Sequence, residues 1–510
     1  MPFLWVKVLI FQGSTHQNGV GSLSDLSDNN QNPITNKHKL SHKKTVRNCF
    51  IAIITTTAIF VTGFSVNFRV LKNEYAAGVL NLEFYKKSEN RNTDVLFLGG
   101  SSMSANIELA ELWKEYGISG YCLGGGGSTM YDNYYRLVEA QKLHSAKLII
   151  VEVRPVTYSS EYQGEEAKME NVTGLSLSAN KLKYINTAVE PESRLDYILD
   201  FPLYHSRYLS LSKWDFLHSS ILGTNDKGTW TIFYGNQYSP ELIPISGITE
   251  YRAINEKQEY YLRKIIEYCN KNALPLLLIK TPDANREANQ PFYNTVGLIA
   301  EEYNVSFLDF NQYDEAVGLL PKDFYYDANH LNVAGARKCT DYLGNYLKEN
   351  YDLADHRGDA DYQSWDLFTN NREDLYLRAI TDNEDYFSEL IRDSRKITVI
   401  PYKLPNKKSE ALQEVENALS GIRHFMRDSN DAAYENDNKE HIILGNHEVD
   451  IDKNHQNCTI YVNNKNIASF ASSGYLFIIY DEITDKIADV AGFTADNNFV
   501  LRHFDIGEVE

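Results

Sequence analysis

The sequence predicts an α/β fold of three layers over residues 94–352, in which helices cover both faces of a parallel sheet. Two observations predict it. Five short, nearly continuous apolar runs indicate strands, because a strand inside a parallel sheet is buried on both faces. Amphipathic stretches between these runs place apolar residues three and four positions apart, as helices packed on a sheet require. The alternation of strand and helix then implies parallel strands joined by helical crossovers.

The elements of this domain are expected in a regular order with one interruption. Strands are predicted at Val95–Leu98, Tyr121–Leu123, Leu148–Val153, Leu274–Ile279 and Ser306–Phe310. Helices are predicted at Ile107–Tyr116, Tyr131–Leu143, Glu250–Asn272, Val296–Tyr303 and Val333–Leu347. Residues 158–246 break the alternation with a long, aromatic and irregular segment, which favours an insertion that covers or flanks the strand ends.

A second, smaller α+β domain is expected at residues 376–510, after a polar linker at 353–375. Its opening predicts a helix at Glu384–Asp393, a strand at Ile397–Tyr402 and a helix capped by Ser409. Later strands are predicted at Ile442–Leu444, Cys458–Val462, Tyr475–Tyr480, Ile487–Val490 and Phe499–Arg502, with hairpin turns at Asn463–Asn464 and Asp485–Lys486. A solvated loop is expected to carry His447, Asp450, Asp452 and His455.

The N-terminal part predicts a membrane anchor. Residues 49–68 contain no charged residue and are long enough to cross a bilayer as a helix. The basic residues before them lie in a polar tail, 1–48, which is expected to be disordered. The positive-inside rule therefore leaves this tail in the cytoplasm and places the chain from the linker 69–93 onward outside the cell membrane. A buried core helix is the alternative interpretation of 49–68.

Composition excludes several classes of function. The 510 residues carry a formal net charge of −19 with a pI near 5.2, which repels polyphosphate backbones, so no nucleic acid partner is expected. The five cysteines show no CxxC spacing and predict neither a zinc site nor a disulfide framework. We expect no metal ion and no other cofactor.

Two polar motifs at strand ends carry candidate chemistry. The sequence GGSS at 99–102 follows the first strand and opens a helix, where unpaired backbone N–H groups can hold an oxyanion. An ordinary glycine and serine turn is the alternative. Asp327 and His330 follow the fifth strand with the spacing of one tight turn. A serine hydroxyl needs an imidazole to take its proton and a carboxylate to orient that imidazole, so these residues predict nucleophilic catalysis.

On these motifs the chain from about 94 to 350 resembles the SGNH/GDSL hydrolase superfamily, whose fold is flavodoxin-like. GGSS is similar to its first block, YCLGGGG to its second and DANH to its fifth. The chain is particularly similar to membrane-anchored members that act on envelope polymers, including D-alanine-transfer proteins of lipoteichoic acid and polysaccharide O-acetylation proteins. The resemblance implies that Ser101, rather than Ser102, is the nucleophile. It also implies that the N–H groups of Ser101 and Gly124 bind the oxyanion.

One block of that superfamily is missing. Its third block supplies an asparagine after the third strand, where this chain has VEVRPV with Glu152 and Arg154. Arg154 is a candidate further oxyanion donor, and a structural ion pair between Glu152 and Arg154 is the alternative. Without the asparagine, slow turnover or a donor from elsewhere is expected. The C-terminal part resembles a FAM3/ILEI-type domain in HIILGN and SSGYLFIIYDEITDKIADVAGF, which implies that it binds glycan or a partner.

The sequence thus favours a membrane-anchored, extracytoplasmic serine esterase or O-acyltransferase. Its predicted substrate is an acyl ester of a cell-envelope polysaccharide or a teichoic-acid-like polymer, with a membrane-bound O-acyltransferase as a candidate partner. The residues leave hydrolysis and transfer open. The alternative is a catalytically inactive protein of the same fold that binds or assembles envelope glycan, which the missing asparagine favours.

Overall fold

The computed structural model describes residues 44, 46–58, 82, 85, 86, 90, 92–211, 227–229, 235, 238–392, 395–404, 409–422, 432–436, 439–453 and 456–506. The chain divides into two compact units, Met1–Asn67 and Phe68–Glu510. In the first unit, residues 46–58 are helical. Within the described ranges, no helix combines the length and the apolar character that a membrane crossing requires. The second half of the predicted span 49–68 lies outside these ranges.

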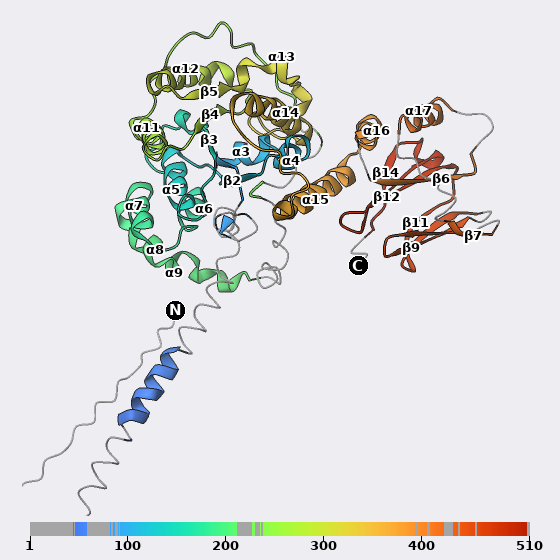
Figure 1. The fold of residues 1–510 in the computed structure, drawn as a ribbon, viewed down its shortest axis with the longest axis horizontal. Helices are drawn as coiled ribbons and strands as arrows, with labels where there is room; N and C mark the ends of the chain where they lie inside the picture. Colours follow the sequence, from blue (N-terminus) through green and yellow to red (C-terminus); the bar gives the residue numbers. More distant parts are fainter. Residues whose placement is uncertain are drawn as a thin grey trace, which may run out of the picture. The chain divides into compact units, whose positions relative to one another are not determined.

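The second unit begins with a five-stranded parallel sheet in the order β2-β1-β3-β4-β5, so the predicted parallel sheet is confirmed (Figure 1). The strands are β1 (Val95–Gly99), β2 (Gly120–Gly124), β3 (Leu148–Glu152), β4 (Leu276–Lys280) and β5 (Ser306–Asp309). All residues of the first four strands are buried, which explains their apolar sequences; the buried Glu152 and Lys280 are the charged exceptions and stand at the last positions of β3 and β4.

Alternate residues of each strand face two different helix layers. Leu96 and Leu98 pack in one core with α5 (Met130–Ala140), α11 (Glu256–Lys271) and α12 (Arg286–Tyr303). Val95 and Phe97 pack in the other core with α4 (Leu109–Tyr116) and α14 (Val333–Asn350). The sheet is therefore the middle of three layers, and its carboxyl ends meet at one edge where side chains from several loops can converge.

Residues 165–209 of the insertion after β3 are mostly helical, so the expectation of an irregular segment is wrong there, whereas the described residues 238–246 contain no helix or strand. Its α-helices are α6 (Glu165–Val172), α7 (Ala179–Ala188), α8 (Arg194–Leu199) and α9 (Phe201–Tyr204). Tyr184 of α7 stacks on Tyr135 of α5 at 4.9 Å, and its hydroxyl donates to the buried Asp132 carboxylate. Tyr184 is thus a core residue that fastens α7 to α5.

The predicted polar linker 353–375 is also wrong in part, because its second half belongs to α15 (Gln363–Ala379). Trp365 is buried and donates from Nε1 to the Gly120 carbonyl at 3.2 Å, while Asp366 accepts from Trp113 of α4. Phe368 lies in the core between α4 and α14. The helix therefore completes the covering layer of the parallel sheet.

The C-terminal part contains two antiparallel sheets in the orders β14-β13-β12-β6 and β11-β10-β9-β8-β7. The first consists of β6 (Lys396–Tyr402), β12 (Gly474–Asp481), β13 (Lys486–Thr494) and β14 (Leu501–His503); the second consists of β7 (Ala432–Asn436), β8 (Lys439–Leu444), β9 (His447–Lys453), β10 (Cys458–Val462) and β11 (Lys465–Phe470). One core lies between the two sheets. The other lies between the four-stranded sheet and α16 (Asn383–Arg392) with α17 (Glu410–Leu419).

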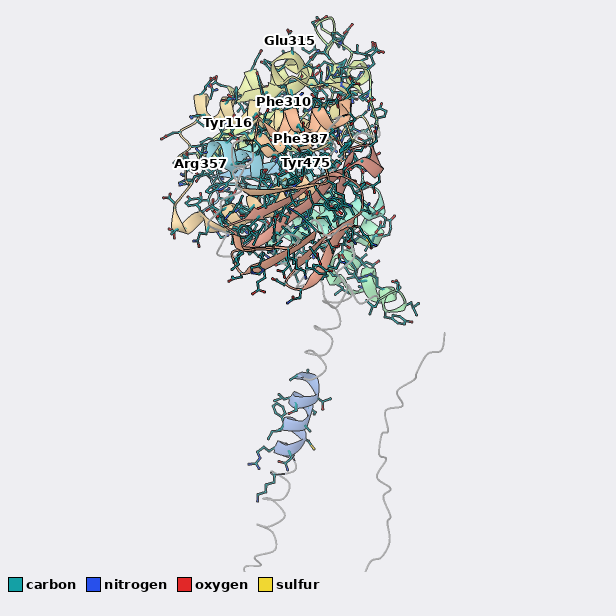
Figure 2. All side chains as sticks on the ribbon, turned by 90° about the vertical axis from the view of Figure 1, so that its right-hand side faces the viewer. Tyr116, Phe310, Glu315, Arg357, Phe387 and Tyr475 are labelled. Atoms are coloured by element: carbon teal, nitrogen blue, oxygen red, sulfur yellow. The ribbon has the colours of Figure 1, made fainter. Side chains whose placement is uncertain are left out.

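Side-chain contacts hold these helices on the sheet. Phe387 of α16 stacks on Phe493 of β13 at 4.8 Å, and Tyr475 of β12 donates to Glu416 of α17; Figure 2 labels Phe387 and Tyr475. Asp450 and Asp452 lie on β9, so the expectation that they decorate a loop is wrong. On that strand Val449 and Ile451 face the core and the acidic residues alternate with them.

A buried ion cluster joins four helices of the second unit. The Arg337 guanidinium of α14 contacts Glu111 of α4 at 3.3 Å, Glu373 of α15, and Glu389 of α16 at 2.9 Å. The Arg337 side chain is only 8% exposed. Burial raises the pKa of Glu111 to about 7, although Arg337 opposes this shift. Burial raises the pKa of Glu373, but Arg337, Lys114 and Arg395 together outweigh it and lower this pKa to about 2.

The raised pKa of Glu111 predicts a pH-dependent stability. A carboxyl group whose pKa is higher in the folded chain binds more protons when folded, so it lowers the free energy of unfolding as pH rises from about 4.5 to about 7. Between these pH values, the free energy of unfolding of the wild type is expected to fall by up to about 3 kcal/mol relative to that of Glu111→Gln. Urea unfolding at pH 5 and pH 8 measures the difference. Glu115→Gln, a half-exposed site on the same helix, is the control, and an equal effect in both variants would contradict the assignment.

Candidate active site

A chain of hydrogen bonds connects the three predicted catalytic side chains at the carboxyl edge of the parallel sheet. Ser101 Oγ lies 2.9 Å from His330 Nε2, and His330 Nδ1 lies 2.8 Å from Asp327 Oδ2. The His330 side chain is almost buried, whereas Ser101 is partly exposed. The arrangement gives the hydroxyl a base and the base a carboxylate partner, as nucleophilic catalysis requires.

The tight turn after β1 presents Ser101. Ser101 is the first residue of the short helix α3 (Ser101–Asn106), two positions after the last residue of β1. A Cβ atom on Gly99 would lie 2.5 Å from the Met103 Cβ atom and 3.1 Å from the Glu152 side chain. Only glycine therefore allows the chain to turn so sharply from strand to helix.

The loop that carries His330 is fixed by its own carboxylate. Asp327 Oδ1 accepts hydrogen bonds from the backbone N–H groups of Asn329 at 2.7 Å and His330 at 2.9 Å. Tyr325 donates its backbone N–H to the His330 carbonyl, and Phe324 and Leu331 form an isolated antiparallel bridge. Asp327 thus holds both the turn and the imidazole ring, so the spacing Asp-x-x-His is a property of the loop geometry.

Asn106, which the sequence analysis did not single out, ties this loop to the nucleophile helix. Its side chain is fully buried, donates to the Asn329 carbonyl at 2.9 Å and accepts from the Leu331 N–H at 2.9 Å. These two hydrogen bonds hold the backbone on either side of His330. Asn106 therefore sets the distance between Ser101 and His330. Its partners are more than two hundred positions away in the chain, and no local signal marks it.

Ser102 points away from His330. Its hydroxyl donates to both oxygens of Glu152 at 2.8 and 2.7 Å, and Thr281 Oγ1 also donates to Glu152. Glu152 is fully buried at the end of β3. The geometry thus favours Ser101 over Ser102 as the nucleophile. The alternative of an ion pair between Glu152 and Arg154 is wrong, because Glu152 is bound by hydroxyl groups and no ion pair to Arg154 is found among the described residues.

Gly124 ends β2 opposite Gly99 of β1. A Cβ atom at Gly124 would lie 2.1 Å from the Ser104 hydroxyl, so only glycine allows α3 to approach this strand end. Burial raises the pKa of the neighbouring Cys122 thiol to about 12, although the Ser104 hydroxyl and the Gly124 N–H lower it. The Gly124 N–H therefore lies beside the Cys122 sulfur, and its role as an oxyanion donor stays a prediction.

The insertion holds the glycine-rich loop that follows Gly124. Asn171 of α6 donates to the Gly126 carbonyl at 2.9 Å and accepts from the Ser128 hydroxyl at 3.1 Å. Arg136 of α5 donates to Asn171 and to Ser128. The loop is thus fixed by buried polar side chains, and the insertion contributes to the shape of the site.

Arg154 follows β3 at the same edge and begins the 3₁₀ helix Arg154–Thr157. Burial lowers the pKa of its guanidinium, but Tyr158, Glu152, Tyr293 and Asp283 outweigh this effect, so the pKa lies above its usual value. The side chain is half-buried, and no hydrogen bond or ion pair of its guanidinium occurs within the described part of the chain. Arg154 is therefore a cation that a ligand can reach.

Tyr326 covers one face of the His330 imidazole. Its ring stacks on the His330 ring with centroids 5.2 Å apart and an interplanar angle of 16°, and 45% of the residue is exposed. Burial raises the pKa of Tyr326, and the positive charge of Arg154 opposes this shift. An exposed aromatic ring beside a catalytic group offers a surface on which a sugar or acyl group can pack.

Two further findings concern metal and thiol chemistry. In the described ranges, no group of three or more histidine, cysteine, aspartate or glutamate side chains is arranged to hold a metal ion. The five cysteines are free thiols.

Comparisons with known proteins give weak similarities. No protein-family model matches the chain, and no curated protein matches it. Among solved structures, it is similar to a protein assigned to the lipolytic G-D-S-L family from Desulfitobacterium hafniense, with 14% identity, 50% of this chain and 100% of that chain covered, and a TM-score of 0.28. It is also similar to a GDSL-like lipase from Bacteroides thetaiotaomicron, with 11% identity, 55% and 98% covered, and a TM-score of 0.27. With TM-scores this low, neither similarity assigns a family or an activity to the chain.

Proposed function

We propose that this protein is a serine esterase or O-acyltransferase of the SGNH type, with Ser101 as nucleophile. The observation that carries the proposal is the 2.9 Å distance between Ser101 Oγ and His330 Nε2, with His330 Nδ1 held by Asp327. A serine placed by chance in a turn needs neither partner. A hydroxyl, an imidazole and a carboxylate joined in this order constitute the constellation of acyl transfer.

In the proposed reaction His330 takes the proton of Ser101 as Oγ attacks the acyl carbonyl. The tetrahedral oxyanion is bound by the N–H groups of Ser101 and Gly124. His330 then gives its proton to the leaving alcohol, and the C–O bond of the ester breaks to leave an acyl-serine. Water or a second hydroxyl attacks this intermediate, which yields the free acid or a new ester, and Asp327 stabilises the imidazolium in both halves.

We infer a place at the cell membrane, outside the cytoplasm, from the uncharged segment 49–68 and the basic residues that precede it. A tether concentrates the active site near membrane-bound polymers and acyl donors, which favours envelope polysaccharide or teichoic-acid-like substrates and a membrane-bound O-acyltransferase as partner. The C-terminal sheets would bind the polymer or a partner.

A second candidate is an inactive binding protein of the same fold. The absence of an asparagine donor after β3 favours it, because the loss of one oxyanion donor costs about 10²- to 10³-fold in rate. Against it stand the intact hydrogen bonds among Ser101, His330 and Asp327, which a binder does not require.

A fluorescent fluorophosphonate distinguishes the two candidates on the detergent-solubilised full-length chain. Such a probe reacts with an activated serine, so the wild type is expected to be labelled and Ser101→Ala to be spared. Ser102→Ala is the matched control and is expected to keep its label, because Ser102 bonds to Glu152 and not to His330. Equal labelling of wild type and Ser101→Ala, or of neither, would reject Ser101 as an activated nucleophile.

A further inference from the structure

Arg154 and Ser101 occupy equivalent positions at the ends of neighbouring strands. In the register of β1 and β3, Leu98 pairs with Val151. Ser101 and Arg154 each stand three residues beyond this pair, and each is the first residue of a helical turn. Adjacent parallel strands lie about 4.8 Å apart, so the two side chains start from neighbouring points of one edge.

The surroundings of Arg154 differ from those of the other cations near this edge. Lys280 is buried and paired with Asp283 at 2.9 Å, and Arg136 is bound by Asn171, Ser128 and the Leu123 carbonyl. Arg154 has no such partner among the residues that the structure describes, although the protein has an excess of acidic groups. A guanidinium that stays charged, because nearby groups outweigh its burial, and that bonds to no described acceptor is available to bind an anionic ligand.

Tyr326 and Tyr158 both interact electrostatically with this cation. Tyr326 lies over His330 on one side, and Tyr158, four residues after Arg154, is the strongest of the groups that raise its pKa. Tyr326 stacks on His330, and the strand register places Arg154 at the strand end beside that of Ser101, so this edge offers an aromatic ring for a flat or apolar moiety and a planar donor for an anion. Guanidinium groups bind carboxylates and phosphates through two parallel hydrogen bonds.

We propose that Arg154 binds a permanent negative charge of the substrate beside the ester that Ser101 attacks. The preferred substrates are then acyl esters of sugars or polyols that carry a carboxylate or a phosphate close to the acylated hydroxyl. This inference rests on the proposed acyl-ester activity of Ser101. It differs from an oxyanion-donor role for Arg154, because a permanent charge is present only in some substrates whereas the oxyanion forms with every ester.

Two matched substrate pairs test the proposal on the full-length chain in detergent. The first pair is methyl 3-O-acetylglucuronide and methyl 3-O-acetylglucoside, which differ in a carboxylate; the second is 1-acetylglycerol 3-phosphate and 1-acetylglycerol. The wild type is expected to prefer the anionic member of at least one pair. Arg154→Gln should lower kcat/KM for that member by about 10- to 100-fold, the effect of one charge-assisted contact, and change the neutral member by less than about threefold. The pair with the larger preference identifies carboxylate or phosphate as the ligand.

Three further variants complete the test. Arg154→Lys keeps the charge and should retain part of the preference even if Arg154→Gln folds poorly. Arg357→Gln, which removes a surface arginine paired with Asp355, should change neither pair. Equal losses on anionic and neutral esters would overturn the proposal and assign Arg154 to the oxyanion. If the wild type hydrolyses no ester, calorimetry of Ser101→Ala with methyl glucuronide, methyl glucoside, glycerol 3-phosphate and glycerol tests the anion site directly. Tighter binding of an anionic compound than of its neutral partner would support the site. No such difference would overturn the proposal.

Discussion

His330→Ala is expected to lower kcat for acetyl-ester hydrolysis by about 10⁴-fold or more, because no other described base lies within reach of the Ser101 hydroxyl. Without the imidazole the proton of Ser101 has no acceptor and the leaving alcohol has no donor. Turnover of 4-nitrophenyl acetate by the purified full-length chain measures the effect. A chain that folds normally, by circular dichroism, and loses less than tenfold would contradict the assignment of His330.

The same constellation predicts that its members act as a unit. The double variant Ser101→Ala/His330→Ala should be no slower than either single variant, since either change alone removes the nucleophilic path. Additive losses would indicate that the two residues act in separate steps. Ser102→Ala is again the matched control, and its kcat should stay within about tenfold of the wild type, because one lost hydrogen bond to Glu152 leaves Thr281 in place.

Arg337→Met is expected to lower the free energy of unfolding by about 3–5 kcal/mol, because it leaves three buried carboxylates without their shared cation. The loss in the free energy of unfolding should be smaller at pH 5 than at pH 8, because at pH 5 the carboxylates left without Arg337 can bind protons. Urea unfolding at both pH values measures it.

Arg357→Met is the control for this stability measurement. Arg357 pairs with Asp355 on the surface, where both side chains are nearly half exposed, so its loss should stay below about 1 kcal/mol. A loss at Arg337 no larger than the loss at Arg357 would show that the buried cluster contributes nothing to stability.

The parallel sheet could be predicted from the sequence because burial on both faces produces unbroken apolar runs. The elements that were not predicted combine apolar and charged residues. On β9 the apolar Val449 and Ile451 alternate with acidic residues, and the acidic residues alone suggested a loop. On α15 the buried face includes Glu373, which is stable there because Arg337 of another helix pairs with it. A sequence shows the charge but not the partner, so such a helix looks like a polar linker.

The predicted site residues differ in how far local sequence could place them. Ser101 directly follows β1, and the strand ends of a parallel sheet share one edge, so its position follows from the fold. His330 lies in the loop before α14, and α13 (Asp314–Val317) with two 3₁₀ helices separates this loop from β5, so the strand pattern alone does not place it. The environment of Glu152 does not follow in this way, because its hydrogen-bond partners Ser102 and Thr281 come from different strand ends. Asn106 is placed by tertiary contacts alone. Local patterns predict which residues reach the edge, and packing decides which of them touch.

The position of α15 bears on how this chain can be cut. Its first turns carry Trp365 and Phe368 into the layer beside the parallel sheet, and Leu377 near its end belongs to the core under the four-stranded sheet. A fragment that stops after α14 would leave Trp113 uncovered and Arg337 without Glu373 and Glu389. Expression of the parallel-sheet half alone would therefore yield a poorly folded product with exposed apolar surface, and a workable recombinant fragment has to retain both halves.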